Sequence, residues 1–455
     1  GDHRDLHLSL RRQRQMCIRD RFIMTIEEIY KRIFKNFKIL GLGKILSGLF
    51  SALTIFVLAQ YLGVEIFGII AITISIVEVT NIILNLRIWE ATTKFLGDFQ
   101  KDGDKCSQVL LWSLSLSIKF SLISNFIICL ISFYFIESFF KFELEVHNLI
   151  ISYCAVYIFQ TSNEILDSFL RTYNKYKLIL INNLISNLVR LIIVYFLLDY
   201  SYDINFVVMA MGSSIFIGFI VRIFFVHKVF RELKFKFIYK FSAIEKYKIR
   251  FLKFSISTHF ANMINLANEK NLGVLLIGYL VGPFYAGLFK AARSAVKIIR
   301  RIMDPLLDIT FPEFISLVNQ KRIGDLKKLI SNSTKMLGIA SIFLGLLIFF
   351  FSQDIIELFF GSEYLEATKA LNLLIFAALI NNISYWITPL ILAMNNPKYL
   401  LVQTIFVSSI YILTLYPLII SLEHEGAAYS GILRGLCVFI FGMIFIKKFT
   451  KPKTI

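Results

Sequence analysis

Long apolar runs recur along nearly the whole chain, and they limit its possible folds more than any other feature. Each run continues for about 20 residues or more, which is enough for a helix to cross a bilayer. Continuous runs also argue against a membrane barrel, whose strands alternate apolar and polar residues. The composition agrees, because 57% of the 455 residues are hydrophobic and only 7 are Pro. The sequence therefore predicts an all-helical, polytopic membrane protein.

Twelve spans can be placed along the chain, six on each side of a basic connector at residues 231–250. We expect two six-helix bundles around a central cavity, at residues 24–230 and 251–455, joined by this connector on the cytoplasmic side. Residues 1–23 are polar and lack the apolar region of a signal peptide, so we treat them as a non-native leader before Met24. The spans are expected near residues 38–62, 67–88, 108–136, 146–168, 178–198, 204–229, 251–281, 284–311, 333–352, 366–390, 399–421 and 426–446.

The charges of the connecting segments indicate how the spans are oriented. Lys and Arg gather in the connectors that would share a side with both termini, whereas Asp and Glu gather on the other side. Because cytoplasmic loops carry the excess of Lys and Arg, we expect both termini in the cytoplasm. The same distribution accounts for most of the net charge of +18, so nucleic acid is not an expected partner.

The span from Phe284 to Phe311 is unusual because it carries seven charged residues. At about 100° per residue these charges fall within an arc of roughly 100°, and apolar residues cover most of the remaining helix surface. A charge near the middle of a bilayer is costly unless it faces a bundle interior or a water-filled cavity. The charged stripe consists of Lys290, Arg293, Lys297, Arg300, Arg301, Asp304 and Asp308. We therefore treat this stripe as a candidate binding site.

A basic amphipathic helix lying on the cytoplasmic membrane surface is the alternative explanation of this stripe. A surface helix would reverse the side of every later connector. The Lys321–Lys328 cluster and the basic carboxyl-terminal segment would then lie outside the cell. This outcome conflicts with the Lys and Arg bias, so we favour a spanning helix.

Two short patterns repeat between the halves of the chain. YLGVEIFGI follows the first span and YLVGPFYAGL follows the seventh, while LRTYNKY and LAMNNPKY follow spans four and ten. The matched positions are Gly63 with Gly282 and Gly68 with Gly287, at an offset of 219, and Asn174 with Asn396, at an offset of 222. Because six spans return the chain to its starting side, the repeat predicts two homologous bundles related by an axis along the membrane normal.

Polar residues on three other spans are candidates to complete a central site. They recur at i, i+3, i+4 and i+7 spacing, which places them on one face of each helix. Hydrogen bonding between helices in lipid explains their Asn and Ser members equally well. Arg190 lies deep in its span and needs a partner, whereas Lys44 and Arg222 lie near inner helix ends, where snorkelling to the surface is the alternative. The polar faces comprise Ser75, Glu78, Asn81 and Asn85; Asn183, Ser186, Asn187 and Arg190; and Ser255, Thr258, His259, Asn262, Asn265 and Glu269.

The intramembrane cations outnumber the carboxylates that could neutralise them. Glu269 and Lys270 are expected at a depth similar to Lys290 and Arg293, so a local ion pair is expected there. A surplus of positive charge nevertheless remains on the Phe284–Phe311 span. An anionic ligand explains this surplus most directly, since Lys and Arg offer charge-assisted hydrogen bonds to phosphate.

Several motifs together carry a resemblance to a known family. They are YLGVEIFGI, LRIWEATTKFLGDF, FLRTYNKYK and the long segment from Ala261 to Phe314 that includes GPFYAGLFKAARSAVKIIRR. From Met24 onward the chain resembles the polysaccharide-biosynthesis branch of the multidrug, oligosaccharidyl-lipid and polysaccharide (MOP) exporter superfamily. It is most similar to Wzx-type O-antigen flippases.

The resemblance implies translocation of an undecaprenyl-diphosphate-linked oligosaccharide across the bacterial inner membrane, for O-antigen or other surface polysaccharide. It implies rocking of two bundles driven by a proton or sodium gradient, with no further cofactor and with other polysaccharide-assembly proteins as candidate partners. It implies that cations of the first, second and eighth spans engage the diphosphate, and Lys44, Arg87 and the stripe from Lys290 to Arg301 lie in those spans. With Arg190 from the polar face of the fifth span, the residues that we expect to bind the diphosphate are Lys44, Arg190, Lys290, Arg293, Lys297, Arg300 and Arg301. The candidate ion-coupling carboxylates are Glu78, Glu269 and Asp304.

Two other functions remain open. A multidrug exporter of the same superfamily would share the two-bundle architecture, but a basic cavity does not suit cationic drugs. A membrane-embedded polysaccharide polymerase or O-acyltransferase would need a large external loop or an intramembrane histidine set, and only His259 lies within a span. No catalytic residue is assigned, and the scattered Cys and His do not match the spacing of a metal site.

Overall fold

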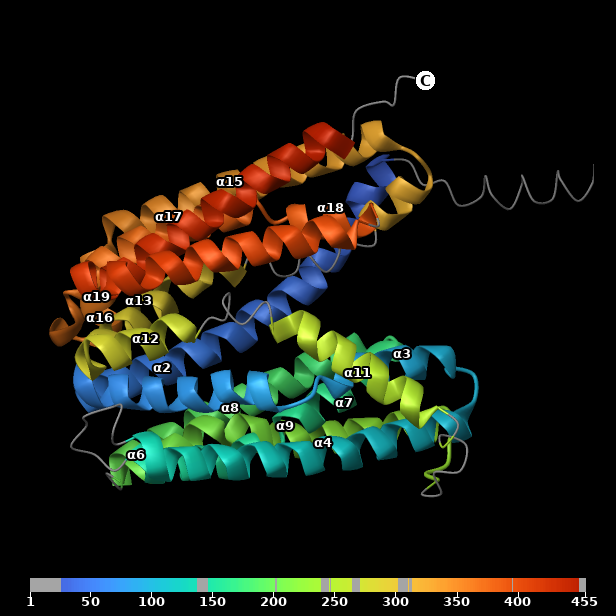
Figure 1. The fold of residues 1–455 in the computed structure, drawn as a ribbon, viewed down its shortest axis with the longest axis horizontal. Coiled ribbons are helices and arrows are strands. Elements are labelled where there is room, and N and C mark those ends of the chain that lie inside the picture. The colour runs from blue at the N-terminus through green and yellow to red at the C-terminus, as the bar shows by residue number, and fades with distance from the viewer. Residues whose placement is uncertain are drawn as a thin grey trace, which may run out of the picture.

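The computed structural model describes residues 26–136, 146–200, 203–238, 245, 247–263, 271–301, 310, 313–394 and 396–449. Within these ranges every regular element is a helix, which confirms the all-helical prediction. The helices form two groups that meet at one end and diverge at the other (Figure 1). The first group is built mainly from the amino-terminal half of the chain and the second from the carboxyl-terminal half.

The amino-terminal group begins with α2, a long helix that bends sharply at Gly63, where φ is 70° and ψ is 174°. The part of α2 before Gly63 crosses diagonally between the two groups, and the part after it lies within the first group (Figure 1). The elements of this half are α2 (Ile26–Leu84), α3 (Ile88–Asp98), α4 (Gly103–Ile131), the short π-helix η1 (Ser132–Ile136), α6 (Val146–Tyr157), α7 (Gln160–Thr172), α8 (Tyr176–Tyr200) and α9 (Ile204–Glu232).

The carboxyl-terminal half ends in α19, which contains a similar bend at Glu423, where φ is 52° and ψ is −128°. Its elements are α11 (Lys248–Met263), α12 (Leu272–Leu280), α13 (Pro283–Arg301), α15 (Ile323–Phe350), α16 (Ser352–Phe360), the 3-10 turn η3 (Ser362–Tyr364), α17 (Ala367–Ile383), α18 (Ile387–Ala393) and α19 (Pro397–Phe449). All of them except α11 lie with the second group (Figure 1).

Seven helical segments in the described ranges are long and apolar enough to cross a membrane. Two of them, Ile45–Leu84 and Lys398–Lys448, contain the bends at Gly63 and Glu423, and at each bend the chain turns back. The expected spans at residues 146–168 and 366–390 are each divided in two, between α6 and α7 and between α17 and α18. At the second break Tyr385 enters the protein interior, where its hydroxyl group contacts the Ser333 hydroxyl group. The chain is thus a multi-pass membrane protein by length and composition of its helices.

The glycines of the sequence repeat lie where the two halves meet. Gly63 and Gly282 both have positive φ, 70° and 104°, which only glycine adopts without strain. Gly68 and Gly287 lie at a backbone contact between α2 and α13. A Cβ atom at Gly68 would lie 1.9 Å from the Pro283 carbonyl oxygen, and one at Gly287 would lie 2.3 Å from the Val64 carbonyl oxygen. The repeated residues therefore allow the two helices to approach backbone to backbone.

The end of the molecule at which the groups meet is also closed by side chains. The Tyr364 hydroxyl group donates to the Ala59 carbonyl oxygen at 3.2 Å, and the Gln60 amide donates to the Leu358 carbonyl oxygen at 2.8 Å. The Phe56 ring packs against Phe359 at a centroid distance of 4.5 Å. These contacts join α2 to α16 and the turn that follows it, so both the backbone and the side chains hold the groups together here.

One helix of the second half packs on the first group. The Phe251 ring of α11 lies 5.2 Å from the Phe95 ring of α3 and 4.8 Å from the Trp112 ring of α4. Farther along α11, the His259 ring nitrogen lies 3.1 Å from the Ile83 carbonyl oxygen. Because α12 instead packs on α13, α2 and α19, the two ends of the expected seventh span have different surroundings.

Replacing Gly68 or Gly287 with Ala should lower the Tm of the detergent-solubilised protein, because the new methyl group would overlap a backbone carbonyl group of the facing helix. Gly338→Ala is the matched control, since nothing lies within 4 Å of a Cβ at this position in α15. Equal Tm values for all three variants would show that α2 and α13 do not approach as closely as described.

Candidate functional site

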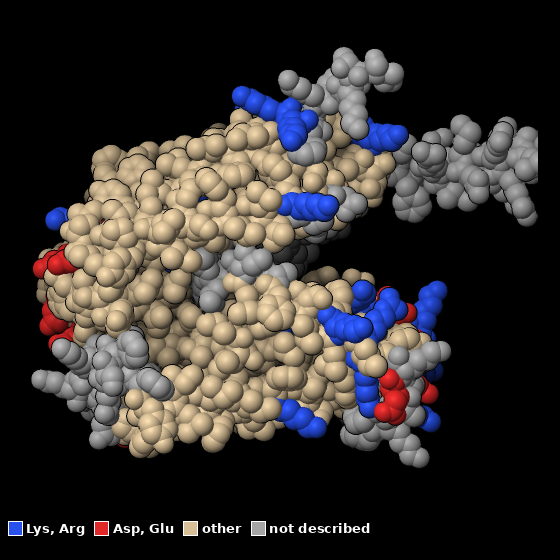
Figure 2. Space-filling view, in the orientation of Figure 1, with Lys and Arg blue, Asp and Glu red and all other residues tan. Residues whose placement is uncertain are grey.

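A cleft lies between the two groups of helices and opens at the end where they diverge (Figure 2). Most of the Lys and Arg side chains visible in this view lie at the ends of the groups near the mouth of the cleft, together with a few Asp and Glu, whereas the charged side chains visible at the opposite end are mainly Asp and Glu (Figure 2). The opposite end includes α16, with Asp354 and Glu357. The cleft therefore opens toward the basic end of the molecule.

Helix α13 lies at the junction of the two groups, packed on α2 and on α17. One face is small and apolar, and its members Ala291, Ala295 and Ile299 are buried, with exposed fractions of 0%, 3% and 0%. The cations lie on the other face, where Lys290 and Arg293 are half-buried and Lys297 is exposed. For residues 284–299 the structure thus shows the two faces that the sequence predicted, with the cationic face at the seam between the groups.

The first two cations of α13 contact residues of both halves of the chain. Lys290 interacts electrostatically with Arg293 and with Glu78 of α2. The Arg293 guanidinium group lies 5.8 Å from the centre of the Phe289 ring, which is within the range of a cation–π contact. Two like charges on adjacent helical turns are unfavourable without an anion nearby, so Glu78 lowers the cost of placing Lys290 and Arg293 together.

Glu78 lies at the centre of this polar cluster. Its carboxylate accepts a hydrogen bond from the Tyr153 hydroxyl group of α6 at 3.3 Å, and a second from the side-chain amide of Asn271, which directly precedes α12. Tyr153 also interacts electrostatically with Arg190 of α8. The predicted residues Glu78, Arg190, Lys290 and Arg293 are therefore brought into one cluster, although they come from three spans.

Arg190 extends this cluster into the first group of helices. Its guanidinium group donates to the Ser214 hydroxyl group of α9 at 3.3 Å, which supplies the partner that its depth in the span requires. The side chain is half-buried. Arg190 thus carries positive charge in the interior of the first group, next to the residues around Glu78.

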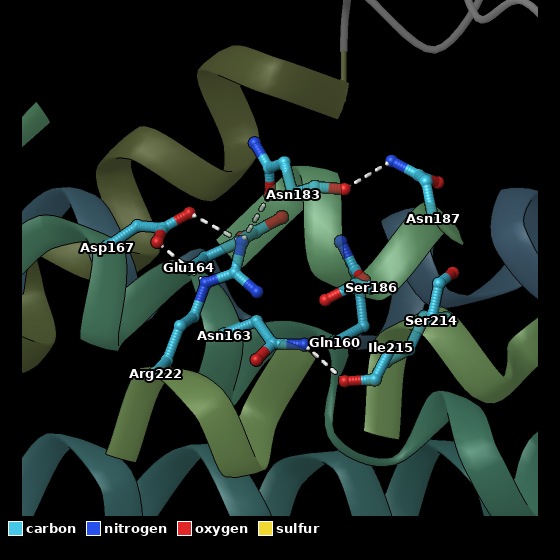
Figure 3. Close-up of a pocket in the computed structure, with 10 residues that line it drawn as sticks. All are labelled: Gln160, Asn163, Glu164, Asp167, Asn183, Ser186, Asn187, Ser214, Ile215 and Arg222. Carbon is cyan, nitrogen blue, oxygen red and sulfur yellow. Dashed lines mark hydrogen bonds and ion pairs between the residues drawn. The ribbon is translucent and has the colours of Figure 1, made fainter. Parts of the chain in front are cut away.

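Beside this cluster, a polar pocket of about 180 Å³ lies among α7, α8 and α9 (Figure 3). Arg222 and Asp167 form its strongest contact, with Nε to Oδ1 at 2.7 Å and Nη2 to Oδ2 at 3.1 Å. Arg222 also donates to the Asn183 side-chain oxygen at 3.1 Å. Gly218, one turn away, leaves room for this guanidinium group. The pocket is lined by Gln160, Asn163, Glu164, Asp167, Asn183, Ser186, Asn187, Ser214, Ile215 and Arg222.

This pocket corrects the interpretation of Arg222 as a snorkelling residue. Arg222 is 8% exposed and its guanidinium group points into the first group of helices, toward Asp167 (Figure 3). A bidentate pair with a buried carboxylate satisfies the charge more fully than the distant membrane surface. Because Asp167 already pairs with the Arg222 guanidinium group and Glu164 adds a second carboxyl group, the pocket does not suit an anionic ligand. We therefore assign the anion site to the cluster around α13 and not to this pocket.

Other predicted site residues lie wholly or partly outside the described part of the chain. Glu269 falls in residues 264–270 and Asp304 in residues 302–309, neither of which the structure describes. Lys44 belongs to α2, and Arg300 and Arg301 belong to the last turn of α13, but their side chains are outside the described residues. Their assignments remain predictions.

Two residues of α19 were missed by the sequence reasoning. Tyr411 is 9% exposed and interacts electrostatically with Arg293 of α13 and with Arg434. Arg434 therefore adds a further cation near the charged face of α13. Arg434 could have been identified from the sequence, because it interrupts the otherwise apolar segment GILRGLCVFIFGMIF of an expected span.

A family model for polysaccharide biosynthesis protein matches residues 33–318, which is more than half of the chain. The chain belongs to this family. The match includes the repeat glycines, the Arg222–Asp167 pair and the whole of α13.

Solved structures of the MOP superfamily share the fold. The lipid II flippase MurJ in an inward closed conformation matches with a TM-score of 0.70 and 17% identity, over 90% of this chain and 88% of that chain. An inward-facing multidrug resistance MATE family transporter matches with a TM-score of 0.63 and 14% identity, over 95% and 97%. A Pyrococcus furiosus transporter, described as having a binding pocket of reverse polarity that suggests a different function, matches at 0.59 and 14%, over 94% and 96%. No curated protein sequence matches the chain.

Replacing Arg222 with Ala should destabilise this family member strongly, because Asp167 would be left as an uncompensated buried charge, at a cost of about 3–5 kcal/mol in a protein interior. Lys175→Ala is the control, since Lys175 pairs with Glu232 at 2.6 Å on the surface, where such pairs contribute about 0–1 kcal/mol. Thermal unfolding in detergent should show a much larger fall in Tm for Arg222→Ala. Equal falls would contradict the assignment of Arg222 to an internal structural pair.

Proposed function

We propose that this protein translocates an undecaprenyl-diphosphate-linked oligosaccharide across the bacterial inner membrane by alternating access. The observation that carries the proposal is the cationic face of α13 at the seam of two helix groups, with Lys290 and Arg293 half-buried and Lys297 exposed. The polysaccharide biosynthesis family supports a lipid-linked glycan as the transported molecule. The similarity in fold to a lipid II flippase supports movement of such a lipid.

The proposal includes a membrane topology of twelve spans with both termini in the cytoplasm. The bends of α2 at Gly63 and of α19 at Glu423 divide each of these helices into two expected spans. The domains would be a six-helix bundle at residues 24–230 and another at residues 251–455, with residues 231–250 as cytoplasmic linker. In this orientation the mouth of the cleft, near the Lys and Arg side chains of Figure 2, faces the cytoplasm, where the lipid-linked glycan is made.

The diphosphate group is the part of the substrate that this cluster would bind. Lys290, Arg293 and Lys297 recur at helical spacing on one face of α13, so they present a row of donors along the cleft side of the seam. Guanidinium and ammonium groups form short, charge-assisted hydrogen bonds with phosphate oxygens. Arg190 and Arg434 would add positive charge from the two sides, and Lys44, Arg300 and Arg301 are proposed to extend the site.

The alternatives differ mainly in the ligand charge that they require. The fold is shared with multidrug transporters, so the fold alone does not separate an exporter of cationic drugs from a flippase. The cluster around α13 has more cations than carboxylates among its described side chains, which favours an anionic ligand. The family and its structural neighbours are not enzymes, and we propose no catalytic role. A proton or sodium gradient is proposed to drive transport, with Glu78, Glu269 and Asp304 as candidate coupling residues.

Arg293→Ala and Lys297→Ala should each reduce translocation of lipid-linked oligosaccharide in inverted vesicles by about tenfold, since each removes a charge-assisted contact with phosphate. The double variant should abolish complementation of a flippase-deficient strain at matched expression. Lys335→Ala is the control, because Lys335 is exposed on α15, outside the cluster.

Full activity of Arg293→Ala, Lys297→Ala and the double variant would contradict the diphosphate site and would return α13 to a structural role. Transport of cationic drugs by vesicles, at rates unaffected by these variants, would favour the multidrug exporter instead.

A further inference from the structure

Glu78 differs from the other described members of the α13 cluster because it is the carboxylate among their cations and neutral donors. Three donors converge on it from three elements, namely Tyr153 of α6, Asn271 at the start of α12 and, through charge, Lys290 of α13. A hydroxyl group, an amide and an ammonium group are also donors that bind phosphate oxygens. The donors around Glu78 are thus of the kinds that a phosphate would need.

The contacts of Glu78 also cross the seam between the halves of the chain. Glu78 and Tyr153 belong to the amino-terminal half, whereas Asn271 and Lys290 belong to the carboxyl-terminal half. Glu78 follows Gly68, the backbone contact with α13, by ten residues, or about 15 Å of helix. The cluster therefore links the two halves at a place deeper in the seam than the end where the groups meet, which is the outer end in the proposed topology.

We infer that the Glu78 carboxylate acts as an internal substitute for the substrate phosphate, holding the two halves together until a diphosphate displaces it from Asn271 and Lys290. This inference rests on the proposed function. A diphosphate carries more negative charge and more acceptor oxygens than a carboxylate, so it competes effectively for the same donors. The empty transporter then keeps its cations neutralised, and it exchanges one anion for another when substrate arrives.

The exchange links ligand binding to the closure of the seam. While Glu78 accepts the hydrogen bond from Asn271 and attracts Lys290 through charge, this link between the halves adds to the contacts of Tyr364, Gln60 and Gly68 at the outer end. Once diphosphate takes the donors, the contacts of Tyr364, Gln60 and Gly68 hold the outer end without the help of Glu78. A ligand that binds one conformation less favourably shifts the population away from it, and the coupling is reciprocal. Diphosphate therefore promotes opening of the outer end, and Glu78 opposes it in the absence of ligand.

Binding of inorganic pyrophosphate to the full-length protein in nanodiscs tests the competition. Glu78→Gln should bind pyrophosphate about tenfold more tightly than wild type, since the competing charge is removed while an amide remains in place. Glu164→Gln is the matched control, because it removes an intramembrane carboxylate whose charged neighbours are Arg87, Asp167 and Arg171 and not the α13 cations. Its affinity should stay within about twofold of wild type.

Crosslinking at the outer end is a second measurement, and it tests whether Glu78 holds the two halves together. Gln60→Cys and Leu358→Cys place two thiols at the Gln60–Leu358 contact, in a background with the native cysteines replaced by Ser. Pyrophosphate should lower the copper-phenanthroline crosslinking yield in otherwise wild-type protein. Glu78→Gln should lower the yield without ligand, and so should Asn271→Ala, which removes a donor to Glu78 and leaves the charge of Glu78 in place.

The outcomes separate this inference from the proposed function. Suppose that wild type binds pyrophosphate, that Arg293→Ala abolishes this binding, and that Glu78→Gln binds no more tightly than wild type. Glu78 then does not stand in for the substrate phosphate, while the anion site is supported. If the crosslinking yields of Glu78→Gln and Asn271→Ala equal that of wild type, both with and without pyrophosphate, Glu78 does not hold the two halves together. If wild type binds no pyrophosphate and Arg293→Ala changes nothing, the proposed function fails and the inference fails with it.

Discussion

The cost of positive charge in a membrane interior is the constraint on which this structure depends. Lys290 and Arg293 lie in a helix whose opposite face is buried among apolar residues, so the charged face must meet either polar groups or water. The fold satisfies this requirement by placing α13 at the seam of two helix groups. Glu78 and Tyr153 reach it from one side, and Arg434 and Tyr411 from the other. A helix buried on all sides within one bundle would need a buried carboxylate for each cation, as Asp167 provides for Arg222.

The position of α13 depends in turn on a close backbone contact. Gly68 and Gly287 let α2 and α13 approach until a methyl group would overlap a carbonyl oxygen. Tyr364 and Phe56 complete the closure at the same end. With one end of the seam packed so tightly, the two groups can diverge only toward the other end, where the cleft opens (Figure 2). The same contact therefore closes this end of the seam, and the two groups diverge at the other end.

Periodic and repeated features of the sequence predicted much of this arrangement. The apolar runs predicted the helices, the stripe on α13 predicted its two faces, and Gly63 with Gly282 marked two turns of positive φ. Features that depend on a neighbouring helix were missed, because the pattern of one helix does not identify its partner. Arg222 at a helix end suggested snorkelling, yet Asp167 of α7 holds it inside. The breaks after Tyr157 and Ile383 were missed for a related reason, since both stretches are apolar enough to read as continuous spans.

Affinity for a series of lipids with fewer phosphates measures the central claim most directly. Undecaprenyl diphosphate, undecaprenyl phosphate and undecaprenol share one apolar chain, so differences among them report on the charged site. If the cationic face of α13 binds the diphosphate, the Kd in nanodiscs should rise by about tenfold or more with each phosphate removed, because each phosphate forms charge-assisted hydrogen bonds. It also predicts that added salt weakens diphosphate binding most. Equal Kd values for the three lipids would contradict a site built to bind the diphosphate.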